Sequence, residues 1–210
     1  MAQIITLLTD FGTRDVYVGV MKGEIASLCP TAQVIDLTHE IPPQDLYAAR
    51  FNLLNAVPYF PENTIHGVVV DPGVGTTRRG IAVQTAQGIL VGPDNGVLSG
   101  VFERYGVSQA VELTNRDYWR VAEPSTTFHG RDIFAPVAAH LACGVPLTAV
   151  GQEIAVDSLM RLNLPSVVDT GQTLQGTIQY IDHFGNCMTT IAAEQLNDNS
   201  WSVTVGGITL

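Results

Sequence analysis

The segment from Val68 to Arg79 constrains this chain most, because it joins an apolar run to a glycine-rich turn that carries charged side chains. Three successive valines suit a strand that is buried on both faces. The proline and glycines that follow cannot continue such a strand, so Asp71 is expected at its carboxyl end. In open α/β sheets, ligands bind at that edge.

Two other segments repeat this pattern of an apolar run followed by polar residues. Ile4 to Leu8 lead to Asp10, and a second run begins at Val34 and ends near Asp36 and His39. Right-handed crossovers in a parallel sheet place the carboxyl ends of all strands at one edge. The pattern therefore predicts that Asp10, Asp36 or His39, and Asp71 share a crevice.

The composition favours a compact globular protein. The chain has 210 residues, of which 46% are hydrophobic and 14% charged, and its formal net charge is −10. Binding to nucleic acid or to an anionic membrane needs a basic face, so we expect neither partner. The amino terminus lacks the basic region of a signal peptide, and no apolar run reaches membrane-spanning length, so a cytoplasmic location is predicted.

The cysteines give no sign of a metal site or of paired sulfurs. Cys29, Cys143 and Cys187 are odd in number and form no CxxC or Cys/His ligand spacing. Cys29 and Cys143 lie in mostly apolar segments, so buried free thiols are expected.

Strand and helix patterns alternate through the first three quarters of the chain and predict an α/β fold with a mostly parallel sheet flanked by helices. Helices are expected over 15–28, 44–57 and about 133–143, with another after Gly96, and further strands over 81–84, 89–91 and 110–113.

From about residue 165 the pattern changes to a loop followed by short strands without helices. Residues 166–171 are expected to be a loop, and strands are expected over 173–181, 188–191 and 202–205. The predicted domains are an α/β domain over 1–165 and a β domain over 172–210. The second contains too few strands to be stable alone, so it is expected to be incomplete or to lean on a neighbour.

Three groups of residues are candidates for chemistry. The turn after Asp71 allows Arg78 to return to it, either as part of a site or as a structural ion pair. His129 precedes a helical pattern beside Gly130, where it faces a crevice or merely lies at the surface or caps the helix, as Asp132 also could. Residues 180–186 either stack on a base and hydrogen-bond it or form a hairpin turn with a core phenylalanine.

Several common motifs are absent from the sequence: the Walker loop, GxGxxG after a strand, the GxSxG elbow and the HExxH helix. A set of acidic and histidine residues offers metal ligands, but their spacing matches no standard pattern, so no metal is predicted. That set is Asp10, Asp36, His39, His66 and Asp71.

Five motifs in order resemble the S-adenosyl-L-methionine hydroxide adenosyltransferase family, whose relatives include fluorinases and chlorinases. The motifs are TDFG at 9–12, DPGVGTTR at 71–78, PDNG at 93–96, FHGRD at 128–132 and IDHFGN at 181–186. The match runs from about residue 4 to about residue 191. The resemblance implies an amino-terminal α/β domain, a small carboxyl-terminal β-barrel, and a homotrimer with active sites at subunit interfaces.

The resemblance also implies roles for particular residues. The Asp–Arg–His triad that marks the hydroxide enzymes matches Asp71, Arg78 and His129, whereas halogenating relatives lack it. The substrate-binding positions are implied to be Asp10 at the ribose, Gly130 beside the nucleophile, Asp182 at the methionine amino group, and Phe184 and Asn186 at the adenine.

One departure concerns the end of the sequence. Family members continue past Leu210, where a Ser–Arg pair holds the methionine carboxylate. If the chain is complete, adenosyl affinity is expected to be weak or absent; if it is a fragment of a longer protein, an ordinary enzyme of this family is expected.

The implied reaction is attack of water or hydroxide on C5′ of S-adenosyl-L-methionine, the substrate, which gives adenosine and L-methionine without a metal or other cofactor. Three alternatives stay open: a halide-using adenosyltransferase, a noncatalytic binder of an adenosyl ligand, and a metal-dependent phosphoesterase.

Overall fold

A computed structural model describes residues 3–196 and 201–209 of the protein. Its internal contacts divide the chain into two units, Met1–Leu162 and Asn163–Leu210. The domain ranges expected from the sequence, 1–165 and 172–210, remain a prediction.

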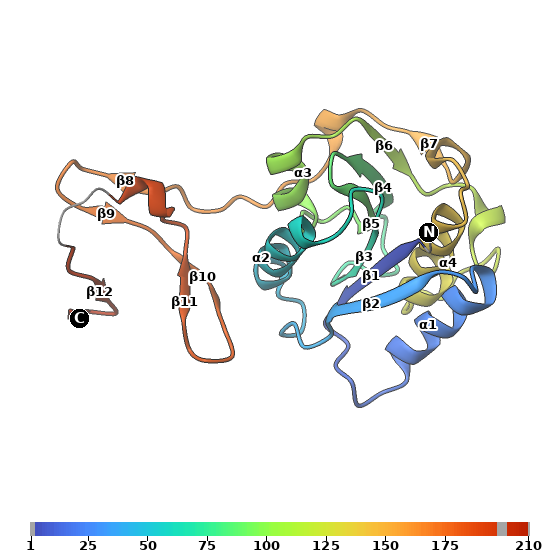
Figure 1. Ribbon diagram of the computed structural model, residues 1–210, viewed down its shortest axis with the longest axis horizontal. Helices are drawn as coiled ribbons and strands as arrows, with labels where there is room; N and C mark the ends of the chain where they lie inside the picture. Colours follow the sequence, from blue (N-terminus) through green and yellow to red (C-terminus); the bar gives the residue numbers. More distant parts are fainter. Residues whose placement is uncertain (1–2, 197–200, 210) are drawn as a thin grey trace. The chain divides into compact units, whose positions relative to one another are not determined.

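A seven-stranded sheet forms the centre of the first unit (Figure 1). Its strands, in spatial order, are β2 (Gln33–Thr38), β1 (Ile4–Thr9), β3 (Ile65–Val69), β5 (Gly88–Pro93), β4 (Gly80–Thr85), β6 (Gln109–Glu112) and β7 (Gln152–Glu153). The pairings β1–β2, β1–β3 and β3–β5 are parallel, and β5–β4, β4–β6 and β6–β7 are antiparallel. Only β4 and β7 therefore run against the other strands, which confirms the predicted mostly parallel sheet.

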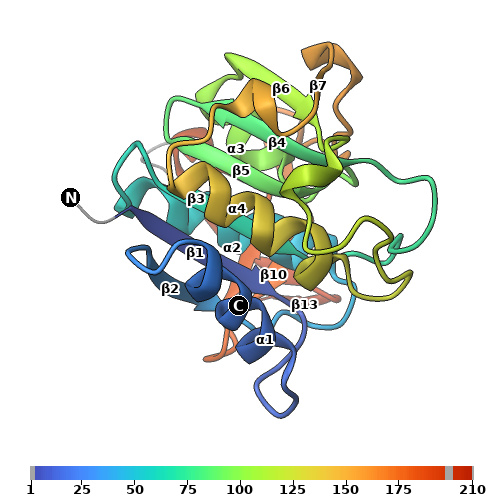
Figure 2. The ribbon, with the colours of Figure 1, turned by 90° about the vertical axis from the view of Figure 1, so that its right-hand side faces the viewer.

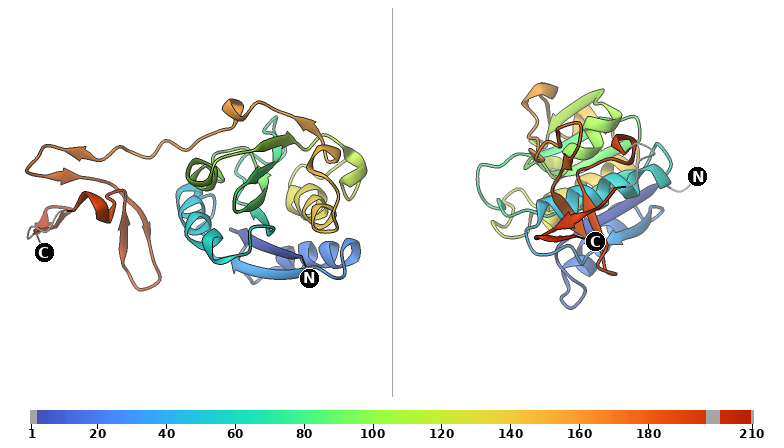
Figure 3. Two further views of the ribbon diagram at one scale, coloured as in Figure 1. Left: turned by 45° about the horizontal axis from the view of Figure 1, so that its top comes forward. Right: turned by 90° about the vertical axis from the view of Figure 1, so that its left-hand side faces the viewer.

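Helices cover both faces of this sheet. On one face α1 packs against α4, and on the other α2 packs against α3 (Figures 2 and 3). The α-helices are α1 (Tyr17–Leu28), α2 (Leu46–Ala56), α3 (Ser99–Tyr105) and α4 (Ala135–Ala142). A π-helical turn, η3 (Gly130–Phe134), runs directly into α4, and short 3₁₀ turns occur at η1 (Val57–Tyr59), η2 (Arg116–Tyr118), η4 (Leu147–Ala149), η5 (Val156–Ser158) and η6 (Ala193–Gln195). None of the described helices is both long and apolar enough to span a membrane.

The central strands form where the sequence predicts them, because their side chains are buried between the two helical layers. Every residue of β3 is buried, as expected for a strand covered on both faces. Gly67 allows β3 and β1 to approach closely, since a Cβ atom there would lie 3.1 Å from Cδ2 of Leu7. Strand β1 lies between β2 and β3, so the connections that lead to these two strands run to opposite sides of β1. This order creates a crevice at the carboxyl ends of β1 and β3.

One histidine belongs to the core rather than to any site. His66 of β3 is fully buried and its Nδ1 lies 2.8 Å from Oγ1 of Thr6. Burial lowers the pKa of His66 to about 4, so the ring is neutral at neutral pH.

The second unit consists of antiparallel strand pairs. They are β8 (Val168–Asp169) with β9 (Leu174–Gln175), β10 (Ile178–Ile181) with β11 (Cys187–Thr189), and β12 (Thr204–Val205) with β13 (Ile208–Thr209). Over residues 163–196 and 201–209 these pairs remain separate two-stranded sheets, and no closed barrel is formed. The β character of this region is confirmed.

Two details of the second unit differ from the sequence prediction. The segment 166–171, expected to be a loop, contains β8. The single strand expected over 173–181 is divided into β9 and β10 at Gly176. A Cβ atom at Gly176 would lie 2.6 Å from Cγ1 of Ile191, so a larger residue there would require the Ile191 side chain to move.

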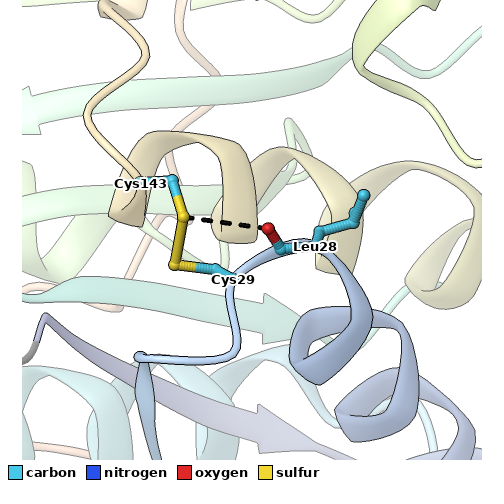
Figure 4. The surroundings of a disulfide bond; sticks show 3 residues. All are labelled: Leu28, Cys29 and Cys143. Carbon is cyan, nitrogen blue, oxygen red and sulfur yellow. Dashed lines mark hydrogen bonds between the residues drawn. A yellow bond between two sulfur atoms is a disulfide. The ribbon is translucent and has the colours of Figure 1, made fainter.

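The prediction of buried free thiols at Cys29 and Cys143 is wrong, because the two residues form a disulfide (Figure 4). Cys29 follows the last residue of α1 and Cys143 follows the last residue of α4, and these two helices pack side by side. Sγ of Cys143 also lies 3.8 Å from the carbonyl oxygen of Leu28. Cys187, in the second unit, is a free and exposed thiol.

Replacement of Cys29 and Cys143 by alanine is expected to lower the free energy of unfolding by about 2–4 kcal/mol under nonreducing conditions, because the bridge restricts the unfolded chain. Denaturant titration measures this, with Cys187→Ala as the matched control that leaves stability unchanged. Thiol titration of unreduced protein in denaturant should detect only Cys187. Reaction of all 3 cysteines before reduction would contradict the bridge.

Candidate functional site

A cavity of about 320 Å³ opens at the carboxyl ends of β1 and β3. Asp10, which follows β1, and Asp71, which follows β3, both line it, as do His129 and Gly130 from the start of the π-helical turn. The structure thus brings together four of the residues predicted for the site, from three separate segments of the chain.

Arg78 joins Asp71 to His129. Its Nη2 donates to Oδ2 of Asp71 at 2.5 Å and contacts Nδ1 of His129 at 2.8 Å. The side chains of Asp71 and Arg78 are only 5% and 8% exposed, so the pair is shielded from water. The ring of Phe134 lies beneath the guanidinium, 5.4 Å from Cζ to the ring centroid. The predicted pairing of Asp71 with Arg78 across the glycine turn is confirmed.

The contact with Arg78 fixes the proton position on His129. A guanidinium only donates hydrogen bonds, so Nδ1 of His129 must accept. A neutral imidazole that accepts at Nδ1 carries its proton on Nε2, and it therefore offers a donor at Nε2 rather than a base. Burial, followed by the positive charge of Arg78, lowers the pKa of His129 and favours this neutral form.

Asp71 retains a free acceptor. Its Oδ1 is buried and has no hydrogen-bond partner among the described residues, whereas Oδ2 is held by Arg78. Burial raises the pKa of the Asp71 carboxyl, although the charge of Arg78 and the nearby backbone N–H of Gly73, which does not reach hydrogen-bond geometry with Oδ1, both oppose this effect. A carboxylate with one orphaned oxygen and a raised pKa is well suited to accept a proton.

The π-helical turn positions His129 and Gly130 against the cavity. His129 is its N-cap residue and Gly130 its first residue, and π-turns of this kind are frequent at functional sites. Asp132, an expected helix cap, does not cap the turn. Its buried carboxylate instead accepts from Nε of Arg131 at 2.6 Å and from the backbone N–H of Ser125 at 2.8 Å. The carboxylate thus ties the preceding loop to the turn.

Space beside Gly130 is limited. A Cβ atom there would lie 3.1 Å from Sδ of Met21 and 3.2 Å from Cε2 of Phe128. Any larger side chain at this position must displace the wall of the cavity.

The carboxylate of Asp10 is held by a residue that sequence analysis missed. The backbone N–H of Gln44 donates to Oδ2 of Asp10 at 2.8 Å. Gln44 lines the cavity and has a φ of +65°, which non-glycine residues adopt only at an energetic cost. No side-chain pattern identifies such a backbone conformation, so the sequence carried no signal for it.

Three aromatic rings of the cavity wall were also missed. Phe11, Tyr17 and Phe128 contact one another edge to face or tilted, with centroids 5.2–5.7 Å apart. Phe11 and Phe128 belong to motifs noted in the sequence, but nothing in the pattern indicated that their rings meet.

Asp36 and His39 do not line the cavity, contrary to one expectation. Nε2 of His39 lies 3.0 Å from Asp36, and Nδ1 lies 2.9 Å from Oγ1 of Thr9. Lys22 binds the other oxygen of Asp36. Within residues 3–196 and 201–209, no group of three or more His, Cys, Asp or Glu side chains is arranged to hold a metal ion. The need for no metal or cofactor stays a prediction.

Asp182, Phe184 and Asn186 form a tight turn between β10 and β11 in the second unit. The carboxylate of Asp182 accepts from the backbone N–H groups of Phe184 at 2.9 Å and Asn186 at 2.8 Å, and from Nδ2 of Asn186 at 2.7 Å. These bonds, that of the Asn186 side chain first, lower the pKa of Asp182. The ring of Phe184 is 86% exposed. The expected hairpin turn is confirmed, but the expectation that its phenylalanine is a core residue is wrong, because Phe184 is exposed. A binding role for these residues stays a prediction.

Comparison with known proteins follows the same division of the chain. Residues 5–151 match the model of the SAM hydroxide adenosyltransferase N-terminal domain, and residues 176–209 match the C-terminal domain of that family. The chain belongs to the SAM hydroxide adenosyltransferase family. The resemblance noted in the sequence is confirmed.

Individual relatives span more than one activity. The chain is 49% identical to the (R)-S-adenosyl-L-methionine hydrolase of Salinispora tropica, over 87% of this chain and 69% of the relative. It is 34% identical to the fluorinase of an Actinoplanes species, over 90% of this chain and 71% of that enzyme. An uncharacterized conserved protein from Thermotoga maritima has a similar structure, with a TM-score of 0.92 and 40% identity over 99% of this chain and 81% of its own.

Replacement of Arg78 by glutamine is expected to raise the pKa of His129, because the substitution removes a positive charge that lowers it. NMR titration of the histidine rings measures the shift, with His129→Gln used to assign the resonance. Arg104→Gln, at an exposed position on α3, is the matched control and should leave the titration unchanged. An unaltered His129 titration in Arg78→Gln would contradict the contact.

Proposed function

We propose that the protein hydrolyses S-adenosyl-L-methionine by attack of water on C5′ of the adenosyl group, which releases L-methionine and gives adenosine. The observation that carries the proposal is the bridge from Arg78 to both Asp71 and His129 beside the cavity. The hydrolase names of relatives that are 38–49% identical support it.

The chemistry needs little besides an oriented nucleophile. A sulfonium is already a good leaving group, so its departure requires no acid. The rate then depends on holding water in line with the carbon–sulfur bond, in a site shielded from bulk solvent. The low exposure of Asp71 and Arg78 meets the second requirement.

Asp71 is proposed as the general base. Its unpartnered Oδ1 accepts the proton of the water as the new carbon–oxygen bond forms. Neutral His129 donates from Nε2 to the oxygen and orients it. Arg78 holds both side chains in place, and its charge stabilises the hydroxide-like character that develops.

The remaining contacts to substrate follow the family pattern. Asp10, fixed by Gln44, is proposed to bind the ribose hydroxyls, and Gly130 to lie beside the nucleophile. Asp182 is proposed to take the methionine amino group, and Phe184 and Asn186 to contact the adenine. A homotrimer with active sites at subunit interfaces and a cytoplasmic location are part of the same proposal.

Incubation with S-adenosyl-L-methionine in oxygen-18 water tests the reaction. The expected product is adenosine that carries the label at its 5′ oxygen, detected by mass spectrometry together with an equal amount of L-methionine. A halide-using adenosyltransferase instead gives 5′-chloroadenosine when chloride is added, and a noncatalytic binder retains the ligand unchanged. Either of those results would count against hydrolysis.

Three substitutions at two positions distinguish the base from the orienting group. Asp71→Asn is expected to lower kcat by about 10²- to 10⁴-fold, because an amide cannot accept the proton. His129→Gln is expected to retain far more activity than His129→Ala, because glutamine can also accept from Arg78 and donate to water. Binding of adenosine, measured by calorimetry, should change little in all three.

The pH dependence gives a further check on the same assignment. Activity of the unsubstituted protein should fall as the pH drops through the raised pKa of Asp71, since protonation removes the base. If His129→Gln and His129→Ala lost equal activity while Asp71→Asn stayed fully active, His129 would be the base and Asp71 the orienting group.

A further inference from the structure

A second cavity, of about 360 Å³, adjoins two members of the triad. Arg78 and His129 line it, together with the polar residues Thr77, Glu112 and Thr114. In the described part of the chain, His129 is the one residue that lines both cavities. His129 therefore borders both the cavity that is lined by Asp10 and Asp71 and the second cavity.

Hydrolysis requires that a new water molecule reach the site in every cycle. Each turnover consumes one water molecule, and the side chains of Asp71 and Arg78 are nearly inaccessible to solvent. An adenosyl substrate in a cavity of about 320 Å³ covers that entrance while it is bound. The water must then be trapped before the substrate arrives, or it must enter by another path.

We propose that the second cavity is the entrance through which water reaches His129 while substrate occupies the first; this inference rests on the proposed function. In each cycle the C5′–sulfur bond breaks with its electron pair leaving on methionine sulfur. The C5′–oxygen bond forms and one water proton passes to Asp71, which releases it to solvent when the products leave. A new water then moves from the second cavity to Nε2 of His129.

The charges around the second cavity suit water better than an anion. Three arginines line it, but each is already paired: Arg78 with Asp71, Arg79 with Asp94 and Arg116 with Glu123. Glu112 adds a negative charge to the same wall. The cavity therefore presents hydrogen-bonding groups without an uncompensated positive charge, which is the environment that ordered water occupies.

Filling the second cavity tests the proposal. Thr114→Trp and Thr77→Trp place a bulky ring at exposed positions of its wall, on two different segments. The matched control is Thr31→Trp, at an exposed position before β2 that lines neither cavity. We expect kcat to fall by about tenfold or more in the first two and to stay unchanged in the control, with the dissociation constant of adenosine within about twofold throughout.

Full kcat in either filled variant that binds adenosine normally would overturn the proposal, because it would mean that water enters through the first cavity before substrate. Absence of hydrolysis in the unsubstituted protein would instead overturn the proposed function. A crystal structure of the unsubstituted protein with adenosine and L-methionine gives an independent readout. Ordered waters from the second cavity to His129 are expected, and a closed wall between them would contradict the inference.

Discussion

The guanidinium of Arg78, held between a carboxylate and an imidazole, is the interaction on which the site depends. A charge this shielded is tolerated only when it is paired and hydrogen-bonded. Asp71 supplies the charge and His129 the second acceptor. Because one nitrogen of Arg78 serves both, the protonation states of the three groups are linked: Asp71 ionised, Arg78 charged, and His129 neutral with its proton on Nε2. The proposed division into base and orienting donor rests on that linkage.

The fold supplies the precision that this arrangement needs. Asp71 follows a strand whose residues are all buried, so its backbone is fixed by the core. Arg78 returns to it through a short turn in which Gly75 has a φ of +77°. The π-helical turn that continues into α4 holds His129 from the opposite side. Three elements of different sequence position thus meet at one sheet edge, as the topology of α/β sheets leads one to expect.

Local patterns predicted the parts of this structure that depend on local physics. Apolar periodicity located α1 and α2, and the valine run with its glycine turn placed Asp71 opposite Arg78. Features that depend on distant contacts were not predictable in this way. Cys29 and Cys143 are separated by 114 positions and meet only because two helices pack together. A short apolar run does not indicate the direction of its strand, so the antiparallel direction of β4 was not predictable either.

The site shows the same contrast. The grouping of His129 with Asp71 and Arg78 was predicted only from the resemblance of five motifs to a known family. A single histidine before a helix carries little information by itself. The left-handed backbone of Gln44 and the meeting of three aromatic rings arise from tertiary packing. Asp182 differs from these residues, because the sequence did single out its motif as a candidate for binding. In the structure its carboxylate accepts hydrogen bonds from its own turn.

The most direct test of the central claim is a neutron diffraction structure of the deuterium-exchanged protein near neutral pH. Our account predicts deuterium on Nε2 of His129, none on Nδ1, and none on either oxygen of Asp71. Deuterium on Nδ1 of His129, or an Arg78 side chain that contacts only one of its two partners, would contradict it.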